Sequence, residues 1–257
     1  QKVGAVTITD SHDVTRQVGK NVTLRDGFAH SSNIFFAKAV YDRFTETGRI
    51  GSFKHGFPEK DPIRPHYFWD SDVAKWMEGA AYILHNTADP ALEAKVDEIV
   101  EDIAENQHED GYFNIFFTVV QPENRWANRD WHELYCAGHL MEAAVAYAKA
   151  TGKTKFLSCM EKYADYIAKV FMEEHTAAFD TPGHEEIELA LVRLYRHTGN
   201  QRYLDLAAVL KKPLAVLIYF VIVMIASWVS VALINKIPHA GNLLFRLPDT
   251  GRTKKAA

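Results

Sequence analysis

Cysteine is scarce in this sequence, and basic residues are not in excess. Only two of the 257 residues are cysteines, Cys136 and Cys159, which excludes a disulfide framework and predicts two buried, inert thiols. The 29 Lys and Arg residues against 33 Asp and Glu give a net charge of −4, so nucleic acid is not an expected partner. With 47% hydrophobic and 24% charged residues, the chain is neither a disordered tail nor a coiled-coil rod. A globular chain of one or two domains is left.

One long apolar segment departs from this composition. Residues 213–234, PLAVLIYFVIVMIASWVSVALI, carry no charge. As a helix the segment would reach about 33 Å, against roughly 30 Å for the hydrocarbon core of a bilayer. We therefore predict a membrane-spanning helix within residues 209–236, a membrane partner through 213–234 and a single pass near the C-terminus. A basic tail follows at 237–257. The alternative is a buried core helix in a soluble cytoplasmic protein.

The rest of the chain divides into an arm and a helical region. Residues 1–30 contain short β-prone stretches such as VTITD and NVTL, which predict an N-terminal arm of strand or irregular structure. From residue 31 to 208 apolar residues recur at every third or fourth position, which is typical of helices. The sequence thus predicts an all-α fold, with helices at about 70–86, 90–107, 131–151, 153–173, 184–198 and 200–212.

A weak internal repeat supports paired helices. The segment TGKTKFL at 151–157 matches TGNQRYL at 198–204, an offset of 47 residues, which is the length of two helices and their connections. Helical hairpins stack because one pair alone cannot bury its apolar stripe. A closed toroid of six pairs and an open solenoid both agree with this repeat.

Residues 107–139 combine flat aromatic rings with polar groups. A sugar needs both, because its ring has an apolar C–H face and a hydroxyl edge. Tyr112, Trp126 and Trp131 are candidates for stacking against a sugar. The alternative is that these rings pack in the core or fasten a loop.

Two histidines occupy similar positions on consecutive predicted hairpins. His132 in RDWHELYCAGH and His184 in PGHEEIELAL each stand near a helix start after a turn, where an imidazole can point into a cavity. The glutamates that follow His184 suit either acid/base chemistry or the dipole of a helix N-terminus. The HEEIE sequence is not a zinc-binding HEXXH motif, because no second histidine follows.

Four separated blocks resemble glycoside hydrolase family 127, whose characterised members are β-L-arabinofuranosidases. The blocks are YFWDSDVAKWMEGAAYIL, ENQHEDGYFNIFFTVVQPENRW, WHELYCAGHLMEAAVAYAKATGK and PGHEEIELALVRLYRHTGNQRYLDLA, and the resemblance covers about residues 45–207. It implies an (α/α)6 toroid and a retaining mechanism. In that mechanism a zinc-held cysteine thiolate is the nucleophile and a glutamate is the acid/base.

The resemblance assigns roles to two residues here. His132 and His184 match the histidines that would contact the hydroxyls of arabinofuranose. Near Val40 the chain departs from the family, where a sugar-binding Gln is expected. The family's acid/base Glu, zinc ligands and nucleophilic Cys lie beyond the point near residue 208 where the resemblance stops. We therefore expect no catalytic residue, no metal ligand and no cofactor in this chain, although zinc is expected in the full-length family.

Residues 31–208 are thus predicted to form an incomplete toroid with seven or eight of twelve helices. The predicted function is that of a truncated glycoside hydrolase for terminal β-L-arabinofuranosyl residues, inactive alone, with L-arabinofuranosyl glycans as partners. Two alternatives stay open. One is a membrane-tethered, non-catalytic carbohydrate-binding or interaction protein. The other is a frameshift or fusion product in which residues 208–257 are foreign.

Overall fold

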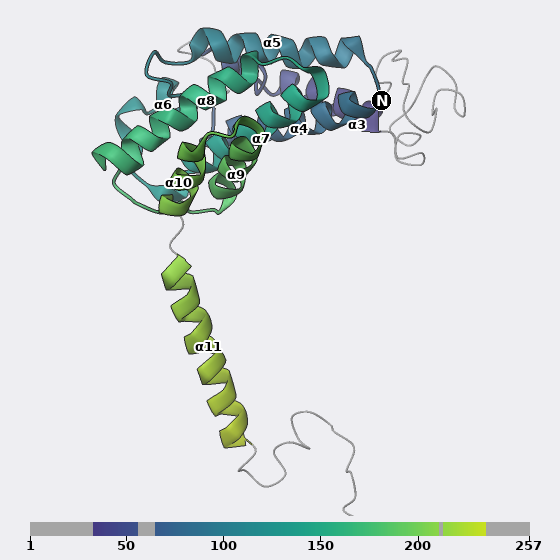
Figure 1. Cartoon of the computed structure of the whole chain (residues 1–257). Helices are drawn as coiled ribbons and strands as arrows, with labels where there is room; N and C mark the ends of the chain where they lie inside the picture. The colour runs from purple at the N-terminus through teal and green to yellow at the C-terminus, as the bar shows by residue number, and fades with distance from the viewer. Residues whose placement is uncertain (1–32, 56–64, 211–212, 235–257) are drawn as a thin grey trace, which may run out of the picture. The chain divides into compact units, whose positions relative to one another are not determined.

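The computed structural model of the chain describes residues 33–55, 65–210 and 213–234 (Figure 1). The predicted arm at 1–30 and the predicted basic tail at 237–257 lie outside these described residues. Contacts between Cα atoms divide the chain into two units, residues 1–211 and 212–257.

The described part of the first unit is helical and contains no β-strand, which confirms the all-α prediction. Most helices begin and end within two or three residues of the predicted positions, because their apolar residues recur with the helical period. The longer elements are α3 (Asn33–Glu46), α4 (Trp69–Asn86), α5 (Pro90–Asn106), α7 (Glu133–Thr151), α8 (Lys155–Ala168), α9 (Glu186–Thr198) and α10 (Gln201–Leu210). The short ones are η1 (Gly51–Lys54), α6 (Phe116–Val119), η2 (Pro122–Asn124), η3 (Arg129–Trp131) and the π-helical η4 (Lys169–Glu174).

Consecutive helices form hairpins that stack in two layers (Figure 1). In one layer α7 packs between α4 and α9, and in the other α8 contacts both α5 and α10. Within each hairpin the two layers touch, as α4 does with α5 and α7 does with α8. This is the arrangement of paired helices in an all-α toroid, and it places α4, α7 and α9 along one face.

The predicted repeat corresponds to two equivalent joints in the backbone. Gly152 ends α7 and Gly199 ends α9, and both are left-handed, with φ of +75° and +76°. Glycine adopts this conformation without the strain that a Cβ would cause, so it is the usual residue at a helix C-terminus.

The two layers are held together by a continuous apolar core. On α8, for example, Phe156, Met160, Tyr163 and Ile167 recur at three or four positions and are 0–1% exposed. Burying such a side chain contributes about 1.5–3 kcal/mol. The core thus fixes the face on which the polar residues of α4, α7 and α9 are presented.

The start of α4 differs from the prediction. The helix begins at Trp69, one residue before the predicted start at about residue 70. The Asp70 carboxylate is fully buried and accepts a hydrogen bond of 2.9 Å from the backbone N–H of Ile115. The start of α4 is thus held by a tertiary contact with the residue that precedes α6, and no side chain caps the helix.

The apolar segment of the second unit forms the helix α11 (Pro213–Ile234). Among the described residues, however, no helix has both the length and the apolar character needed to cross a membrane. The predicted membrane-spanning helix at 213–234 is therefore wrong, and a membrane partner loses its support.

Candidate functional site

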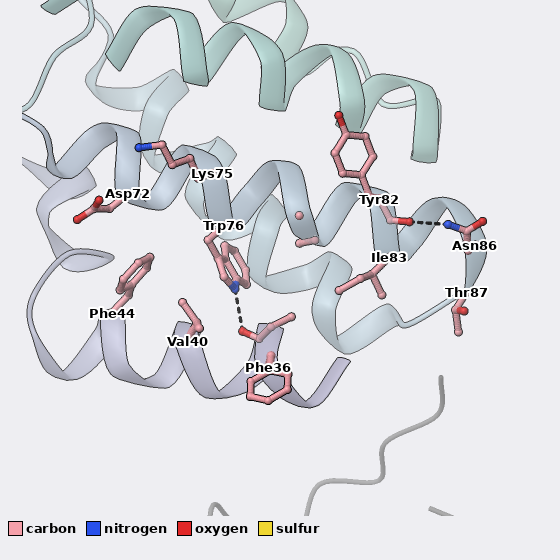
Figure 2. A pocket seen from close by; sticks show the side chains of 13 residues that line it. Phe36, Val40, Phe44, Asp72, Lys75, Trp76, Tyr82, Ile83, Asn86 and Thr87 are labelled. Carbon is pink, nitrogen blue, oxygen red and sulfur yellow. Dashed lines mark hydrogen bonds between the residues drawn. The ribbon is translucent and has the colours of Figure 1, made fainter. Parts of the chain in front are cut away.

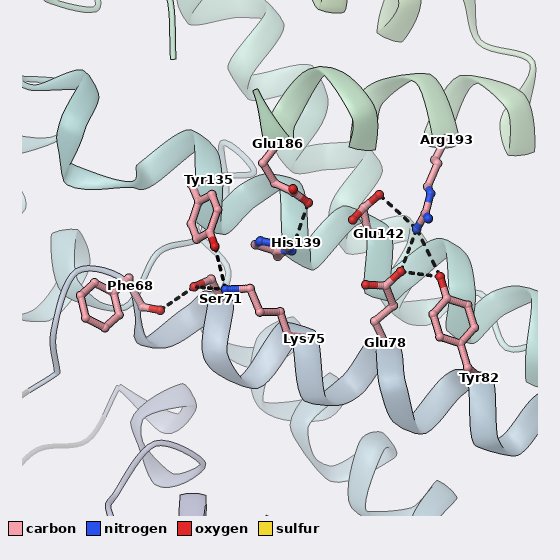
Figure 3. A network of polar contacts seen from close by, with 10 residues as sticks. All are labelled: Phe68, Ser71, Lys75, Glu78, Tyr82, Tyr135, His139, Glu142, Glu186 and Arg193. Atoms are coloured by element: carbon pink, nitrogen blue, oxygen red, sulfur yellow. Dashed lines mark hydrogen bonds and ion pairs between the residues drawn. The ribbon is translucent and has the colours of Figure 1, made fainter. Parts of the chain in front are cut away.

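The three helices of one layer meet along a row of polar side chains, which we call the polar seam (Figure 3). Each helix contributes residues spaced three, four or seven apart, so that they lie on a single helical face. The members of the seam are Ser71, Lys75, Glu78 and Tyr82 on α4, Tyr135, His139 and Glu142 on α7, and Glu186 and Arg193 on α9.

The structure brings the two predicted histidines together at the N-terminal ends of α7 and α9. Their Nε2 atoms are 3.2 Å apart and their ring centroids 4.8 Å apart, although 52 residues separate them in the sequence. At this distance one nitrogen donates and the other accepts, so a single proton lies between them. His132 and His184 are called the histidine pair below.

The backbone and surroundings of His132 are unusual. The residue has φ of +66°, a left-handed conformation that is strained for a residue with a Cβ. Burial lowers the pKa of His132, the backbone of Asp130 opposes that shift, and the neighbouring imidazole of His184 lowers the pKa further. A neutral, hydrogen-bonding imidazole is the result.

Aromatic rings from two helix ends surround the histidine pair. The rings of Tyr67, Phe68 and Tyr135 lie 5.4, 6.0 and 5.4 Å from the ring of His132, centroid to centroid. Tyr135 also contacts the ring of His184, at 5.1 Å. The Nζ atom of Lys75 donates to the Tyr135 hydroxyl at 2.8 Å, which adds a positive charge beside the pair.

The three aromatic residues predicted to stack on a sugar lie elsewhere. Tyr112 is fully buried and Trp126 is 5% exposed, so neither presents an open face in this structure. Trp131 is half-buried and stacks on Phe117, with centroids 5.9 Å apart and ring planes 17° apart. The rings that do contact the histidine pair were missed, although Tyr135 stands three residues after His132, one helical turn away.

A buried carboxylate fastens the preceding loop to the start of α7. Glu133 accepts hydrogen bonds from the Tyr112 hydroxyl at 2.7 Å and from the Trp126 backbone N–H at 2.6 Å. Burial raises the pKa of Glu133 to about 7, against the two hydrogen bonds, which lower it. Because Glu133 directly follows His132, this contact also holds the backbone from which the imidazole projects.

Further along the seam, carboxylates crowd together around one arginine (Figure 3). Arg193 lies 2.7 Å from Glu78 and 3.0 Å from Glu142, measured from Nη1 to Oε1 in each case. Burial raises the pKa of Glu142, and the adjacent carboxylate of Glu186 raises it further. Glu186 faces His139 with an Nδ1–Oε1 distance of 3.0 Å. Glu186 therefore does more than interact with the dipole of the α9 N-terminus, because its carboxylate also contacts His139.

The thiolate–zinc centre implied by the family resemblance does not fit these residues. Both cysteines of the chain are buried and unpaired in a disulfide. Cys136 Sγ donates to the Tyr67 carbonyl at 3.5 Å, and burial raises the pKa of both Cys136 and Cys159. Zinc ligation requires a thiolate, which such surroundings disfavour. Among the described residues, the one group of possible ligands that converges contains no cysteine.

A separate groove of about 870 Å³ lies between α3 and α4 (Figure 2). Its walls include Val40, Phe44 and Trp76, and the Trp76 indole N–H donates to the Ala37 carbonyl at 2.7 Å. The groove includes neither residue of the histidine pair. It is mainly apolar, whereas the pair and the polar seam offer the hydrogen-bonding groups that a sugar requires.

The fold is similar to that of solved glycoside hydrolases. The structure superposes on Ara127N-Se, a GH127 β-L-arabinofuranosidase from Geobacillus stearothermophilus T6, with a TM-score of 0.63, 44% identity and coverage of 72% of this chain and 30% of that one. A solved GH127 β-arabinofuranosidase gives a TM-score of 0.61 and 33% identity, over 68% of this chain and 29% of that one. The non-reducing end β-L-arabinofuranosidase of Bifidobacterium longum subsp. longum is 42% identical over 154 residues, which are 57% of this chain and 23% of that protein.

The family model of the GH127 β-L-arabinofuranosidase catalytic domain matches residues 6–219. The chain therefore belongs to this glycoside hydrolase family, which confirms the resemblance and extends it on both sides of residues 45–207. It spans 23% of the curated relative and 29–30% of the two solved structures.

Proposed function

We propose that this chain forms the sugar-binding wall of a GH127-type site, in which His132 and His184 bind the hydroxyls of a terminal β-L-arabinofuranosyl residue. The observation that carries the proposal is the convergence of the two Nε2 atoms, 3.2 Å apart, from separate hairpins. A curated relative is a non-reducing end β-L-arabinofuranosidase, which supports this choice of sugar.

The groups around the pair have the chemistry that a sugar requires. Each Nε2 atom that faces the other imidazole can instead donate to or accept from a sugar hydroxyl, so the two imidazoles can bind adjacent hydroxyls. The half-buried rings of Tyr67 and Phe68 provide apolar surface for C–H groups, while the Lys75 ammonium and the Tyr135 hydroxyl provide polar contacts.

We expect binding without hydrolysis by this chain alone. Retaining hydrolysis requires a nucleophile and an acid/base that flank the glycosidic bond. The family's nucleophile is a thiolate, but burial raises the pKa of Cys136 and Cys159, and neither thiol belongs to the polar seam.

Calorimetric titration of the full chain with a β-L-arabinofuranosyl disaccharide tests the binding. We expect saturable binding that is lost in His132→Ala and His184→Ala. The matched control is His197→Ala, at an exposed position in the last turn of α9, which should bind as the wild type does. An α-L-arabinofuranosyl disaccharide tests specificity. Absence of binding by the folded wild type, or equal binding by the alanine variants, would contradict the proposal.

Hydrolysis is tested separately with an aryl β-L-arabinofuranoside, with and without added Zn²⁺. We expect no release of the aryl group above the uncatalysed rate. Turnover that survives purification and disappears in His184→Ala would show that the chain is a complete enzyme, and the expectation of binding alone would be wrong.

A further inference from the structure

Three metal-ligating side chains converge in the polar seam, beyond the histidine pair. His139 and Glu142 lie three residues apart on one face of α7, and Glu186 faces them from the first turn of α9 (Figure 3). One possible ligand atom from each lies within 4.8 Å of the others, and the Nδ1 atom of His139 is 3.0 Å from Oε1 of Glu186.

The approach of the two helices at this point depends on a glycine. A Cβ added to Gly138 would lie 2.9 Å from Cγ of Glu186 and 3.1 Å from its backbone oxygen. A Cβ contact under 3.0 Å is essentially never seen, and 3.1 Å to a backbone atom is tighter than most, so a larger residue at 138 would require the Glu186 side chain or the α9 backbone to shift. The Glu186 carboxylate is thereby placed against His139 and Glu142.

The polar atoms of this group are buried and incompletely paired. The side chains of His139, Glu142 and Glu186 are 12%, 6% and 16% exposed. The Nε2 atom of His139 is shielded from solvent and has no hydrogen-bond partner among the described residues. Its Nδ1 atom lies 3.0 Å from Oε1 of Glu186, and Oε1 of Glu142 lies 3.0 Å from Nη1 of Arg193. A buried polar atom without a hydrogen bond is destabilising, because it has lost its hydration and gained nothing in return.

Positive charge in the neighbourhood does not balance the carboxylates. Arg193 lies 3.0 Å from Glu142 and 2.7 Å from Glu78, so its single positive charge is shared by two carboxylates. The carboxylate of Glu186 adds a third negative charge nearby. Lys75 donates instead to the hydroxyls of Ser71 and Tyr135. A further cation would balance the negative charge of the carboxylates.

We propose that His139, Glu142 and Glu186 bind one divalent transition-metal ion, with Zn²⁺ as the best match to their ligands. One imidazole nitrogen and two carboxylate oxygens are a donor set that Zn²⁺ accepts, and such a site leaves a fourth position for water. The ion would join α7 to α9 and so hold His184 beside His132. The site contains no thiolate, which separates it from the cysteine–zinc centre implied by the family resemblance, and it does not depend on sugar binding.

Competition for Zn²⁺ between the metal-free full chain and a chromophoric chelator tests the proposal. We expect one Zn²⁺ per chain, bound at least about tenfold more weakly by Glu142→Gln, Glu186→Gln and His139→Phe. The matched control is Glu185→Gln, which makes the same change in charge at an exposed neighbouring position and should bind as the wild type does. Circular dichroism reports whether each variant is folded.

X-ray absorption at the zinc edge of the loaded wild type keeps the test decisive even if a variant does not fold. We expect a first shell of nitrogen and oxygen atoms with one imidazole. Four results would overturn the proposal: no stoichiometric Zn²⁺, unchanged affinity in a folded Glu186→Gln variant, sulfur in the first shell, or binding that is lost in His184→Ala and kept in the three variants.

Discussion

Replacing Glu133 by Gln should change how the stability of the chain depends on pH. Burial raises the pKa of this carboxyl to about 7 in the folded chain, from 4.5 for an ordinary Glu. Because the folded pKa is the higher one, protonation favours folding, and the contribution is lost as pH rises from about 4.5 to 7. At 1.36 kcal/mol per pH unit, the wild type should lose about 2–3 kcal/mol between pH 5 and pH 8 through this group.

The neutral amide of Glu133→Gln cannot titrate, so the variant should lack this part of the loss. Its NH₂ group can donate to the Tyr112 hydroxyl, which accepts as well as donates, while its oxygen accepts from the Trp126 N–H. The variant should therefore stay within about 1 kcal/mol of the wild type at pH 5 and should be more stable than it by about 2–3 kcal/mol at pH 8.

Urea denaturation at pH 5, 6, 7 and 8, followed by circular dichroism, measures this difference. The control is Glu109→Gln, an exposed substitution in the loop that contains Tyr112, which reports the effect of the change in net charge alone. The difference in unfolding free energy between the wild type and Glu133→Gln should shift by about 2–3 kcal/mol across the range. Parallel curves would mean that Glu133 is ionised throughout, and the reasoning from burial would be refuted.

Three further substitutions test other parts of the structure by urea denaturation. His132→Gly relieves the left-handed backbone at φ +66° and should stabilise the chain by about 1 kcal/mol while abolishing sugar binding; a loss of stability would show that the backbone is not strained. Gly138→Ala places a Cβ 2.9 Å from Glu186 and should cost about 1–3 kcal/mol, whereas a neutral result would mean that α9 moves freely. Trp76→Phe removes the 2.7 Å bond to the Ala37 carbonyl and should cost about 1–3 kcal/mol, with faster amide exchange in α3; protection equal to the wild type would contradict that anchoring role.

Much of the fold could be predicted from local sequence, because the spacing of apolar residues identifies each helix and its buried face. Gly152 and Gly199, which lie in the repeated segments, end α7 and α9. The start of α4 was less predictable, since Asp70 pairs with Ile115, 45 residues away. Patterns within one helix do not predict a hydrogen-bond partner that is 45 residues away.

The candidate site was predicted in part. The similar context of His132 and His184 singled out both residues, and the structure brings their rings together. The polar seam was missed, although one signal was present: Tyr135, His139 and Glu142 repeat at three and four positions on a helix that is otherwise almost entirely apolar. The ring of Tyr112 is buried in this structure. An aromatic ring suits a sugar site and a core equally well, so the sequence alone does not distinguish the two.

The matching left-handed joints after α7 and α9 have a consequence for how such a chain can lengthen. Each joint redirects the backbone by the same rotation, so one 47-residue period begins and ends in the same local geometry. Duplication of a whole period would add one complete helix pair and one joint of the same geometry, and deletion would remove one of each. The number of helix pairs in this architecture can thus change by one through a single duplication, and the connecting turn keeps the geometry that is already present.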